Sequence, residues 1–335
     1  MPDIPRPLLN DYPEFADPMA RPRYTGIPTF MRAPLRESLE GVEIGLVGVP
    51  FDGGVTNRTG ARHGPREVRN QSSLMRKFNQ SSGIAPFDLC KVADVGDAWV
   101  VRPFEIVGAL REIEAFYHVL HDANVIPISV GGDHSVTLPV FRAIARDRPI
   151  GMVHFDAHCD TGDDYLGSKF HHGAPFRRAV EEGLLDPTRT IQIGIRGGTV
   201  MPDLWRFSHE TGMRVVYMDE LYERGVDQII AEARQVVGDG PTYITFDVDG
   251  LDPIYAPGTG TPEAGGFSVY EAQRMIRGLR GLNLIGADVV EVAPPFDPSG
   301  LTAFHAASIM FELLCVVADA TSRRAGQQQN GSPAA

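Results

Sequence analysis

Residues 150–160 read IGMVHFDAHCD, and this stretch decides the fold. Its first part, 150–155, is mostly apolar and is typical of a buried strand. In an extended backbone successive side chains point to opposite faces, so Asp156, His158 and Asp160 emerge on the same side. A strand that ends in three such side chains predicts a metal site at its carboxyl end.

Two further apolar runs end in the same kind of chemistry. GGDHS at 131–135 follows the run 125–130 and contributes His134, and DVDGLDP at 247–253 follows the run 242–246. The same alternation places Asp247 and Asp249 on one face. Since ligands gather at the carboxyl ends of the strands in open α/β sheets, we expect these pieces to form one dinuclear metal site.

Apolar, β-branched runs alternate with helical patterns along the chain. Such alternation predicts an α/β fold of three layers, in which a mainly parallel central sheet is flanked by helices. We expect strands at 42–50, 89–92, 125–130, 150–155, 190–195, 215–218, 242–246 and 284–290, and helices near 66–76, 104–122, 136–146, 174–184, 220–237, 268–280 and 303–322.

The chain divides into three parts by composition. Residues 1–40 are rich in Pro and Arg and are expected to form an N-terminal arm, a surface wrap or subunit contact. Residues 41–325 are expected to form a single α/β catalytic domain, because α/β enzymes commonly hold one core at this length. The tail, 326–335, is poor in apolar residues and is expected to be disordered.

Composition and charge exclude several classes of protein. The net charge of −12 disfavours binding to nucleic acid. We find no apolar run long enough to cross a bilayer, so no membrane partner is expected. No secretory signal is expected at the start, which predicts a cytoplasmic location. The cysteines, Cys90, Cys159 and Cys315, form no CxxC pair and are expected to be reduced thiols.

The three motifs, in this order, resemble the signature of the ureohydrolases, the family of arginase, agmatinase and guanidinobutyrase. The resemblance covers about residues 40–320 and implies an arginase-like fold of the agmatinase and guanidinobutyrase branch. It extends to NRTGARHGP at 57–65, HGAPF at 172–176, APGTGTPE at 256–263 and DVVEVAP at 288–294.

The resemblance implies two divalent ions that share two bridging carboxylates. It assigns His134, Asp156, Asp160 and Asp247 to one ion, and Asp156, His158, Asp247 and Asp249 to the other. Carboxylates with imidazoles suit Mn²⁺, with Ni²⁺ or Co²⁺ as alternatives. These acids could instead cap helices and turns, but so many carboxylates held together would be costly without cations. For Asp252 we favour a turn, or a contact behind the ligands, over direct ligation.

The resemblance also implies the catalytic roles. Hydroxide between the two ions would attack the guanidinium carbon, and Asp160 would accept and deliver the proton. His172 matches a proton shuttle or substrate contact, the alternative being a surface histidine. Glu291 matches the acid that pairs with the guanidinium, the alternative being a structural salt bridge. Cys159 is expected to face away from the ligands.

A small guanidino compound would be cleaved to urea and an amine. The best guess is 4-guanidinobutyrate or agmatine, with guanidinopropionate, guanidine or a biguanide such as metformin as alternatives, because the loop 161–171 and the unusual Ala174 leave the substrate open. Other classes are a one-zinc deacetylase-type hydrolase and a structural subunit of a mixed oligomer. A homotrimer or homohexamer is implied, and a heteromer with a related chain stays open.

Overall fold

The computed structural model describes residues 22–331, with side chains up to residue 327. Its centre is a sheet in which each pair of neighbouring strands is parallel, in the order β2-β1-β3-β8-β7-β4-β5-β6. The strands are β1 (Ile44–Gly48), β2 (Val92–Asp97), β3 (Ile126–Val130), β4 (Ile150–Phe155), β5 (Leu185–Ile195), β6 (Arg214–Tyr217), β7 (Thr242–Asp247) and β8 (Leu284–Val290). The prediction of a mainly parallel sheet is confirmed.

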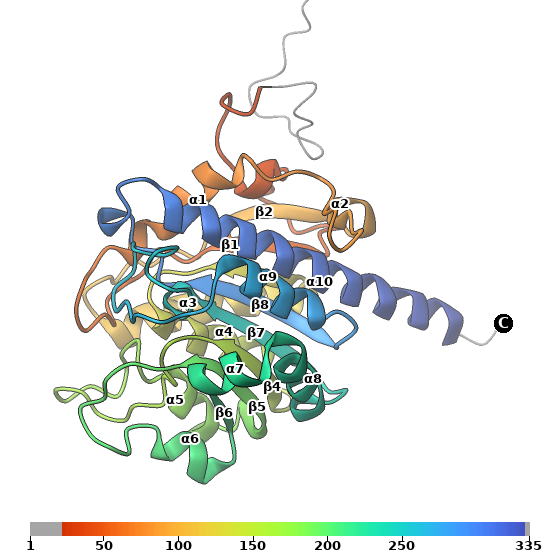
Figure 1. The fold of residues 1–335 in the computed structure, drawn as a ribbon. Helices are drawn as coiled ribbons and strands as arrows, with labels where there is room; N and C mark the ends of the chain where they lie inside the picture. Colours follow the sequence, from red (N-terminus) through yellow and green to blue (C-terminus); the bar gives the residue numbers. More distant parts are fainter. Residues whose placement is uncertain (1–21, 332–335) are drawn as a thin grey trace, which may run out of the picture.

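Helices cover both faces of the sheet, which gives three layers (Figure 1). One face carries α1 (Gly64–Ser72), α2 (Pro86–Leu89), α7 (Met218–Arg224), α8 (Val226–Val237), α9 (Val269–Gly278) and α10 (Leu301–Gly331). The other carries α3 (Ile106–Asp122), α4 (Thr137–Ile144), α5 (Pro175–Glu181) and α6 (Arg206–Thr211). Burial on both faces explains why the strands are mostly apolar along their length.

Local sequence signals set several element ends. A capping box begins α9, where Ser268 Oγ accepts from Glu271 N (3.2 Å) and Glu271 Oε2 accepts from Ser268 N (2.8 Å). The single helix expected at 220–237 was wrong, because Gly225 adopts a φ of 78° and separates α7 from α8. The strand expected at 89–92 begins only at Val92, since Pro86–Leu89 is helical. The short helix α6 was not predicted.

The helix α10 runs across one face and extends beyond the sheet (Figure 1). It reaches Gly331, so residues 326–331 of the expected tail are helical, and 332–335 lie outside the described residues. By length and composition residues 301–327 could span a membrane, which the sequence analysis overlooked. Since 78% of the most apolar window is buried inside the protein, the apolar character of α10 fits a core helix.

Part of the expected N-terminal arm packs on the domain. Residues 1–21 lie outside the described residues, but Phe30 and Met31 are fully buried in the core. Phe30 N donates to Asp94 Oδ2 over 2.9 Å, and Leu35 forms a bridge with Asp94 of β2. The segment around residues 29–35 is thus tied to the edge of the sheet, and a division at residue 40 stays a prediction.

Candidate metal centre

The motifs predicted to form the site lie on four neighbouring strands, β3, β8, β7 and β4. His134 follows β3 in a short 3-10 helix, Asp156 follows β4, and Glu291 follows β8. Asp247 ends β7 and Asp249 lies in the next turn. All four strands are parallel, so their carboxyl ends meet at one edge of the sheet and bring these side chains together, as expected for an open α/β sheet.

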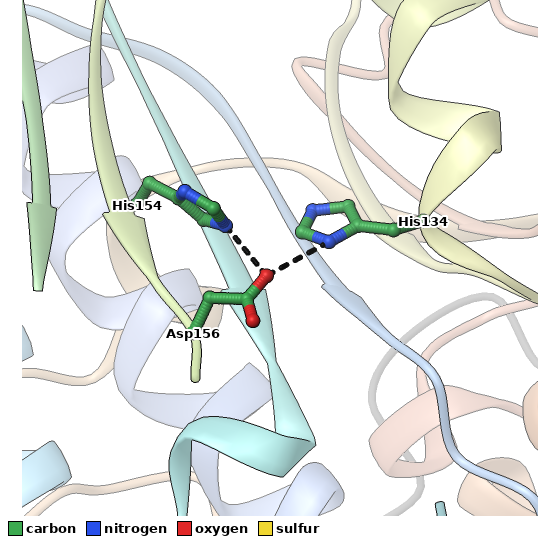
Figure 2. A group of neighbouring side chains, drawn as sticks. All are labelled: His134, His154 and Asp156. Atoms are coloured by element: carbon green, nitrogen blue, oxygen red, sulfur yellow. Dashed lines mark hydrogen bonds and ion pairs between the residues drawn. The ribbon is translucent and has the colours of Figure 1, made fainter. Parts of the chain in front are cut away.

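One part of the cluster surrounds His134, which is fully buried. Its Nδ1 lies 2.9 Å from Asp160 Oδ2, 3.2 Å from Asp156 Oδ2 (Figure 2) and 3.3 Å from Asp247 Oδ2. Within the described chain, however, Nδ1 makes no hydrogen bond of acceptable angle. A buried nitrogen that points among three carboxylates without a hydrogen bond is placed as a metal ligand would be. We call His134 and Asp160 the deep half.

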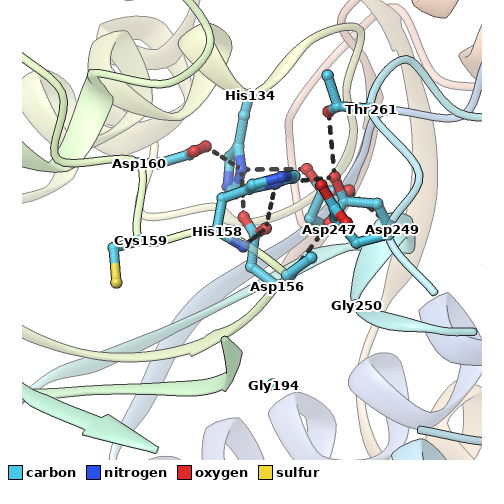
Figure 3. A network of polar contacts seen from close by, with 12 residues as sticks. His134, Asp156, His158, Cys159, Asp160, Gly194, Asp247, Asp249, Gly250 and Thr261 are labelled. Carbon is cyan, nitrogen blue, oxygen red and sulfur yellow. Dashed lines mark hydrogen bonds and ion pairs between the residues drawn. The ribbon is translucent and has the colours of Figure 1, made fainter. Parts of the chain in front are cut away.

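The other part surrounds His158, whose side chain is 23% exposed. Its Nδ1 lies 3.3 Å from Asp156 Oδ1 and 3.2 Å from Asp249 Oδ2 (Figure 3). We call His158 and Asp249 the outer half. Asp156 thus presents Oδ2 to the deep half and Oδ1 to the outer half, the arrangement expected of a bridging carboxylate.

The protein charges alone do not balance in this cluster. Burial, together with repulsion from Asp249 and Asp156, raises the pKa of Asp247 well above its usual range. Burial and the charge of Asp156 raise the pKa of Asp249 to about 6. Burial also opposes ionisation of Asp156, yet the neighbouring imidazoles lower its pKa well below the usual range. Divalent cations would relieve this repulsion, so the donor set fits two ions.

Two site residues hold a backbone conformation that is rare without glycine. The φ angle is 50° at Asp160 and 66° at Glu291. Asp160 O accepts from Phe176 N over 3.2 Å, and Glu291 N donates to Gly132 O over 2.8 Å, so the surrounding loops hold both residues in place. Strain of this kind often clusters at functional sites, although other residues of this chain, such as Asn124 and Leu166, share it.

Glu291 and His172 form a buried pair beside the cluster. Glu291 Oε1 accepts from His172 Nδ1 over 2.9 Å and from His134 N over 3.0 Å. Its second oxygen, Oε2, is buried and has no hydrogen-bond partner among the described residues. Glu291 is thus held by one oxygen, while the other is a buried acceptor that no donor of the described residues satisfies.

The ring of His172 has a partner at each nitrogen. Burial by itself would lower the pKa of His172, but the charge of Glu291 outweighs it and raises the pKa to about 9. On the other side, His172 Nε2 lies 2.8 Å from Thr56 Oγ1 and 3.3 Å from Thr56 N. The short contact to the hydroxyl suits either protonation state, because a hydroxyl both donates and accepts. Sequence reasoning did not single out Thr56.

Four further features lie near the cluster or were expected from the sequence: the side chain of Cys159, the turn at Asp252, the cysteine thiols and His154. Cys159 is buried and points away from the cluster (Figure 3). Asp252 accepts from the backbone N–H groups of Ile254, Gly265 and Gly266, which confirms its turn role. The three cysteines are free and buried. Sequence reasoning missed His154, whose Nε2 lies 2.7 Å from Asp156 Oδ2.

Buried imidazoles and carboxylates gathered at the carboxyl edge of a parallel sheet fit a centre for divalent metal ions. Comparisons with known proteins agree. Residues 42–315 match the Arginase family. A guanidinopropionase from Pseudomonas aeruginosa is 59% identical over 319 residues, which cover 95% of this chain and 100% of the relative. A mitochondrial agmatinase from Gallus gallus is 47% identical over 306 residues, 91% of this chain and 89% of the relative.

A solved structure supports the same assignment. Proclavaminate amidino hydrolase from Streptomyces clavuligerus has a TM-score of 0.86 at 40% identity, and the match covers 90% of this chain and 100% of that one. The chain therefore belongs to the arginase family, in the branch of agmatinases and guanidino acid hydrolases. It is a ureohydrolase, a hydrolase that acts on linear amidines, and the predicted family, fold and reaction class are confirmed.

Proposed function

We propose that this chain hydrolyses a small guanidino acid, with 3-guanidinopropionate as the best candidate, to urea and 3-aminopropionate. The sequence predicted 4-guanidinobutyrate or agmatine first and guanidinopropionate as an alternative. The comparisons favour guanidinopropionate. The relative named guanidinopropionase is 59% identical, whereas the relative named agmatinase is 47% identical. The single structural observation that supports a guanidino substrate is the free oxygen of Glu291 beside the metal ligands.

The proposed ligand set follows the two halves of the cluster. The deep half would hold one ion and the outer half the other, with Asp156 and Asp247 shared between them. Carboxylate oxygens with imidazole nitrogens favour Mn²⁺, and Ni²⁺ or Co²⁺ are alternatives. When bound, two such ions lower the pKa of a shared water and supply a nucleophile near neutral pH.

The remaining chemistry belongs to the side chains. Asp160 Oδ2 lies 2.9 Å from His134 Nδ1 at the edge of the cluster, and its side chain is 9% exposed. Its carboxylate is therefore not fully enclosed, and the resemblance assigns it the transfer of a proton to the leaving amine. A carboxylate can carry that proton from the attacking water to the nitrogen that departs.

Glu291 would orient the guanidinium. Oε2 faces the loop at Gly260, where an added Cβ would lie 3.4 Å from this oxygen. Gly260 carries no side chain, so this loop places no side chain against Oε2. A carboxylate holds a guanidinium by charge-assisted hydrogen bonds, and His172 would keep Glu291 aligned through Oε1.

Two competing functions are less well supported. A deacetylase-type hydrolase with one zinc would not need both His134 and Asp249. Here His134 lies beside Oδ2 of Asp156, and Asp249 lies beside His158 in the outer half. A structural subunit of a mixed oligomer would be expected to have lost ligands, whereas these side chains are assembled and aimed at one another. A trimeric or hexameric state and a cytoplasmic location stay predictions, and light scattering in solution would test the oligomeric state.

The test is release of urea from a substrate panel. Protein loaded separately with Mn²⁺, Ni²⁺ and Co²⁺ would be assayed with 3-guanidinopropionate, 4-guanidinobutyrate, agmatine, arginine, guanidine and metformin. We expect the highest kcat/KM for 3-guanidinopropionate, by about tenfold or more over the homologue one methylene longer. Glu291→Gln should keep the metal but lose turnover.

The possible results test the substrate, the reaction and the role of Glu291 separately. A preference for agmatine would overturn the acid substrate and keep the reaction. No urea from any compound, with two ions bound per chain, would overturn guanidino hydrolysis on this panel. Full activity of Glu291→Gln would remove Glu291 from the substrate site.

A further inference from the structure

A row of polar side chains crosses the sheet beneath the metal ligands. Five neighbouring strands each contribute one residue in register: Gln192 beside His154, His154 beside Thr245, Thr245 beside Asp288, and Asp288 beside Ser129. Every member is at most 1% exposed. Residues in register on parallel strands point to one face of the sheet, and we call these five residues the polar row.

The polar row replaces apolar packing at a depth where burial of polar groups is costly. It lies on the face covered by α3, α4 and α5, with the His154 ring 4.6 Å from the ring of Phe176. Two of its members contact the assigned metal ligands directly. His154 contacts Asp156, and Thr245 Oγ1 lies 2.9 Å from His134 Nε2. The row therefore lies directly behind the metal centre.

The amide of Gln192 has only one acceptable orientation. Its Nε2 lies 2.6 Å from Cys159 O, and a carbonyl oxygen can only accept. Its Oε1 has no partner in the described part of the chain, but exchanging the two atoms would place oxygen against oxygen at Cys159. The NH₂ group therefore occupies the Nε2 position.

This orientation fixes the tautomer of His154. The same Gln192 Nε2 lies 3.0 Å from His154 Nδ1, so that ring nitrogen accepts a hydrogen bond and carries no proton. The ring proton must then lie on Nε2, which donates to Asp156 Oδ2 over 2.7 Å (Figure 2).

We infer that His154 is a positioning residue for the bridging carboxylate of Asp156, held in the Nε2–H tautomer by Gln192, and is not a metal ligand. By distance alone, His154, His134 and Asp156 could share an ion. Ligation through Nε2 would move the proton to Nδ1, where it would face the NH₂ of Gln192, donor against donor. Gln192 thus excludes His154 from coordination.

The consequence concerns the geometry of Asp156. Its Oδ2 is restrained by His154 while Oδ1 accepts from His158 N over 2.6 Å, so the carboxylate cannot rotate out of its bridging position. Hydrogen bonds behind a metal ligand commonly contribute about 10 to 100-fold to metal affinity or activity. This inference rests on the two-ion site of the proposed function.

The test compares His154→Leu, His154→Gln and Ser129→Ala with the wild type. His154→Leu removes the donor, His154→Gln restores an NH₂ donor, and Ser129→Ala alters the far end of the polar row without touching a ligand. Mn²⁺ affinity would be measured by calorimetry, and the pairing of the ions by the exchange-coupled electron paramagnetic resonance spectrum. We expect His154→Leu to weaken Mn²⁺ binding about 10 to 100-fold and to alter the coupled spectrum, with substantial recovery in His154→Gln and no change in Ser129→Ala.

A measurement on the wild-type protein keeps the inference testable if a variant fails to fold. Nitrogen-15 spectra of the metal-free protein should show the proton of His154 on Nε2. A proton on Nδ1, or unchanged Mn²⁺ affinity and coupled spectrum in His154→Leu, would overturn the inference. These readouts do not involve urea, so failure of the substrate assay would leave them intact and would count only against the proposed reaction.

Discussion

The deep and outer halves of the metal centre use the same kinds of ligand in different surroundings. The His134 side chain is 1% exposed and the His158 side chain 23%. Behind His134 lies Thr245, a member of the polar row, and the ring of Phe176 packs edge-on with its centroid 5.1 Å away. His158 has an edge contact with Trp205, at 6.5 Å between ring centroids, as its one aromatic neighbour among the described residues.

The two halves therefore differ in how strongly their charges interact and in how far they are exposed to solvent. Charges in a buried, weakly polar region interact more strongly than charges near solvent, so the deep half depends more on having its full set of partners. The outer half, with its partly exposed histidine, is the more exposed side of the centre. We propose that the deep half, where His134 is buried, fixes the position of the centre.

The largest effect should come from the carboxylate that the two halves share. Asp156→Asn removes a charge from both ligand sets, so we expect loss of both ions and a decrease in kcat/KM of about 1,000-fold or more. Metal content by mass spectrometry and urea release would be measured together. Asp252→Asn, in the neighbouring turn, is the matched control and should keep both ions. An Asp156→Asn protein that retained two ions would contradict the shared-ligand assignment.

Replacing one histidine at a time separates the halves. In the metal-free protein, burial opposes a charge on His134, but Asp156, Asp160 and Asp247 raise its pKa well above the usual range. His134→Ala would leave these acids uncompensated and should lower the free energy of unfolding by about 3 kcal/mol. His158→Ala should cost about 1 kcal/mol, because that side chain is partly exposed. It should still lower metal content and activity together.

Chemical denaturation of both metal-free variants would check this difference. Equal losses of stability would remove the distinction between the halves. Full activity and metal content in His158→Ala would remove His158 from the ligand set.

The free energy of unfolding of the metal-free protein should depend on pH through the pair of His172 and Glu291, which lies beside the two halves. The pKa of His172 is raised to about 9, with Glu291 overcoming the effect of burial. The stability from this pair is therefore fully present below the ordinary histidine pKa of about 6.5 and is lost as the pH rises through about 9. The difference in unfolding free energy between metal-free wild type and Glu291→Gln should shrink by about 2 kcal/mol over that interval. A difference that is constant or grows would contradict the pairing.

The smallest predicted effect is kinetic. Exposure of His158 predicts that a chelator removes the ion of the outer half first, about tenfold faster than the ion of the deep half. Stopped-flow release of Mn²⁺ into excess chelator should show two phases of equal amplitude. A single phase that releases both ions would show that the halves open as one unit.

The convergence of the assigned ligands could be predicted from the sequence, because parallel strands end at one edge of the sheet and bring the motifs together. The predicted alternation beyond the strand ends was wrong, since β4 ends at Phe155, Asp160 has a φ of 50° and Asp249 lies in a 3-10 helix. Alternation does place His154 on the face of Asp156, two residues earlier. That signal was present in the sequence, but the strand was treated as packing alone.

The polar row could not be predicted because it depends on the order of the strands. Gln192 contacts His154 since β5 lies beside β4, and Thr245 reaches the row because β7 lies on the other side of β4. Each residue by itself is one polar side chain in an apolar strand. Only the register across the sheet shows that they form a layer under the metal centre.

The most direct test of the two-ion centre is an anomalous difference map from crystals grown with Mn²⁺. We expect two peaks per chain on either side of the Asp156 carboxylate, one bound by His134 Nδ1 and the other by His158 Nδ1, with Asp247 shared and His154 outside both coordination spheres. A single peak, or an ion bound by His154 Nε2, would contradict the account.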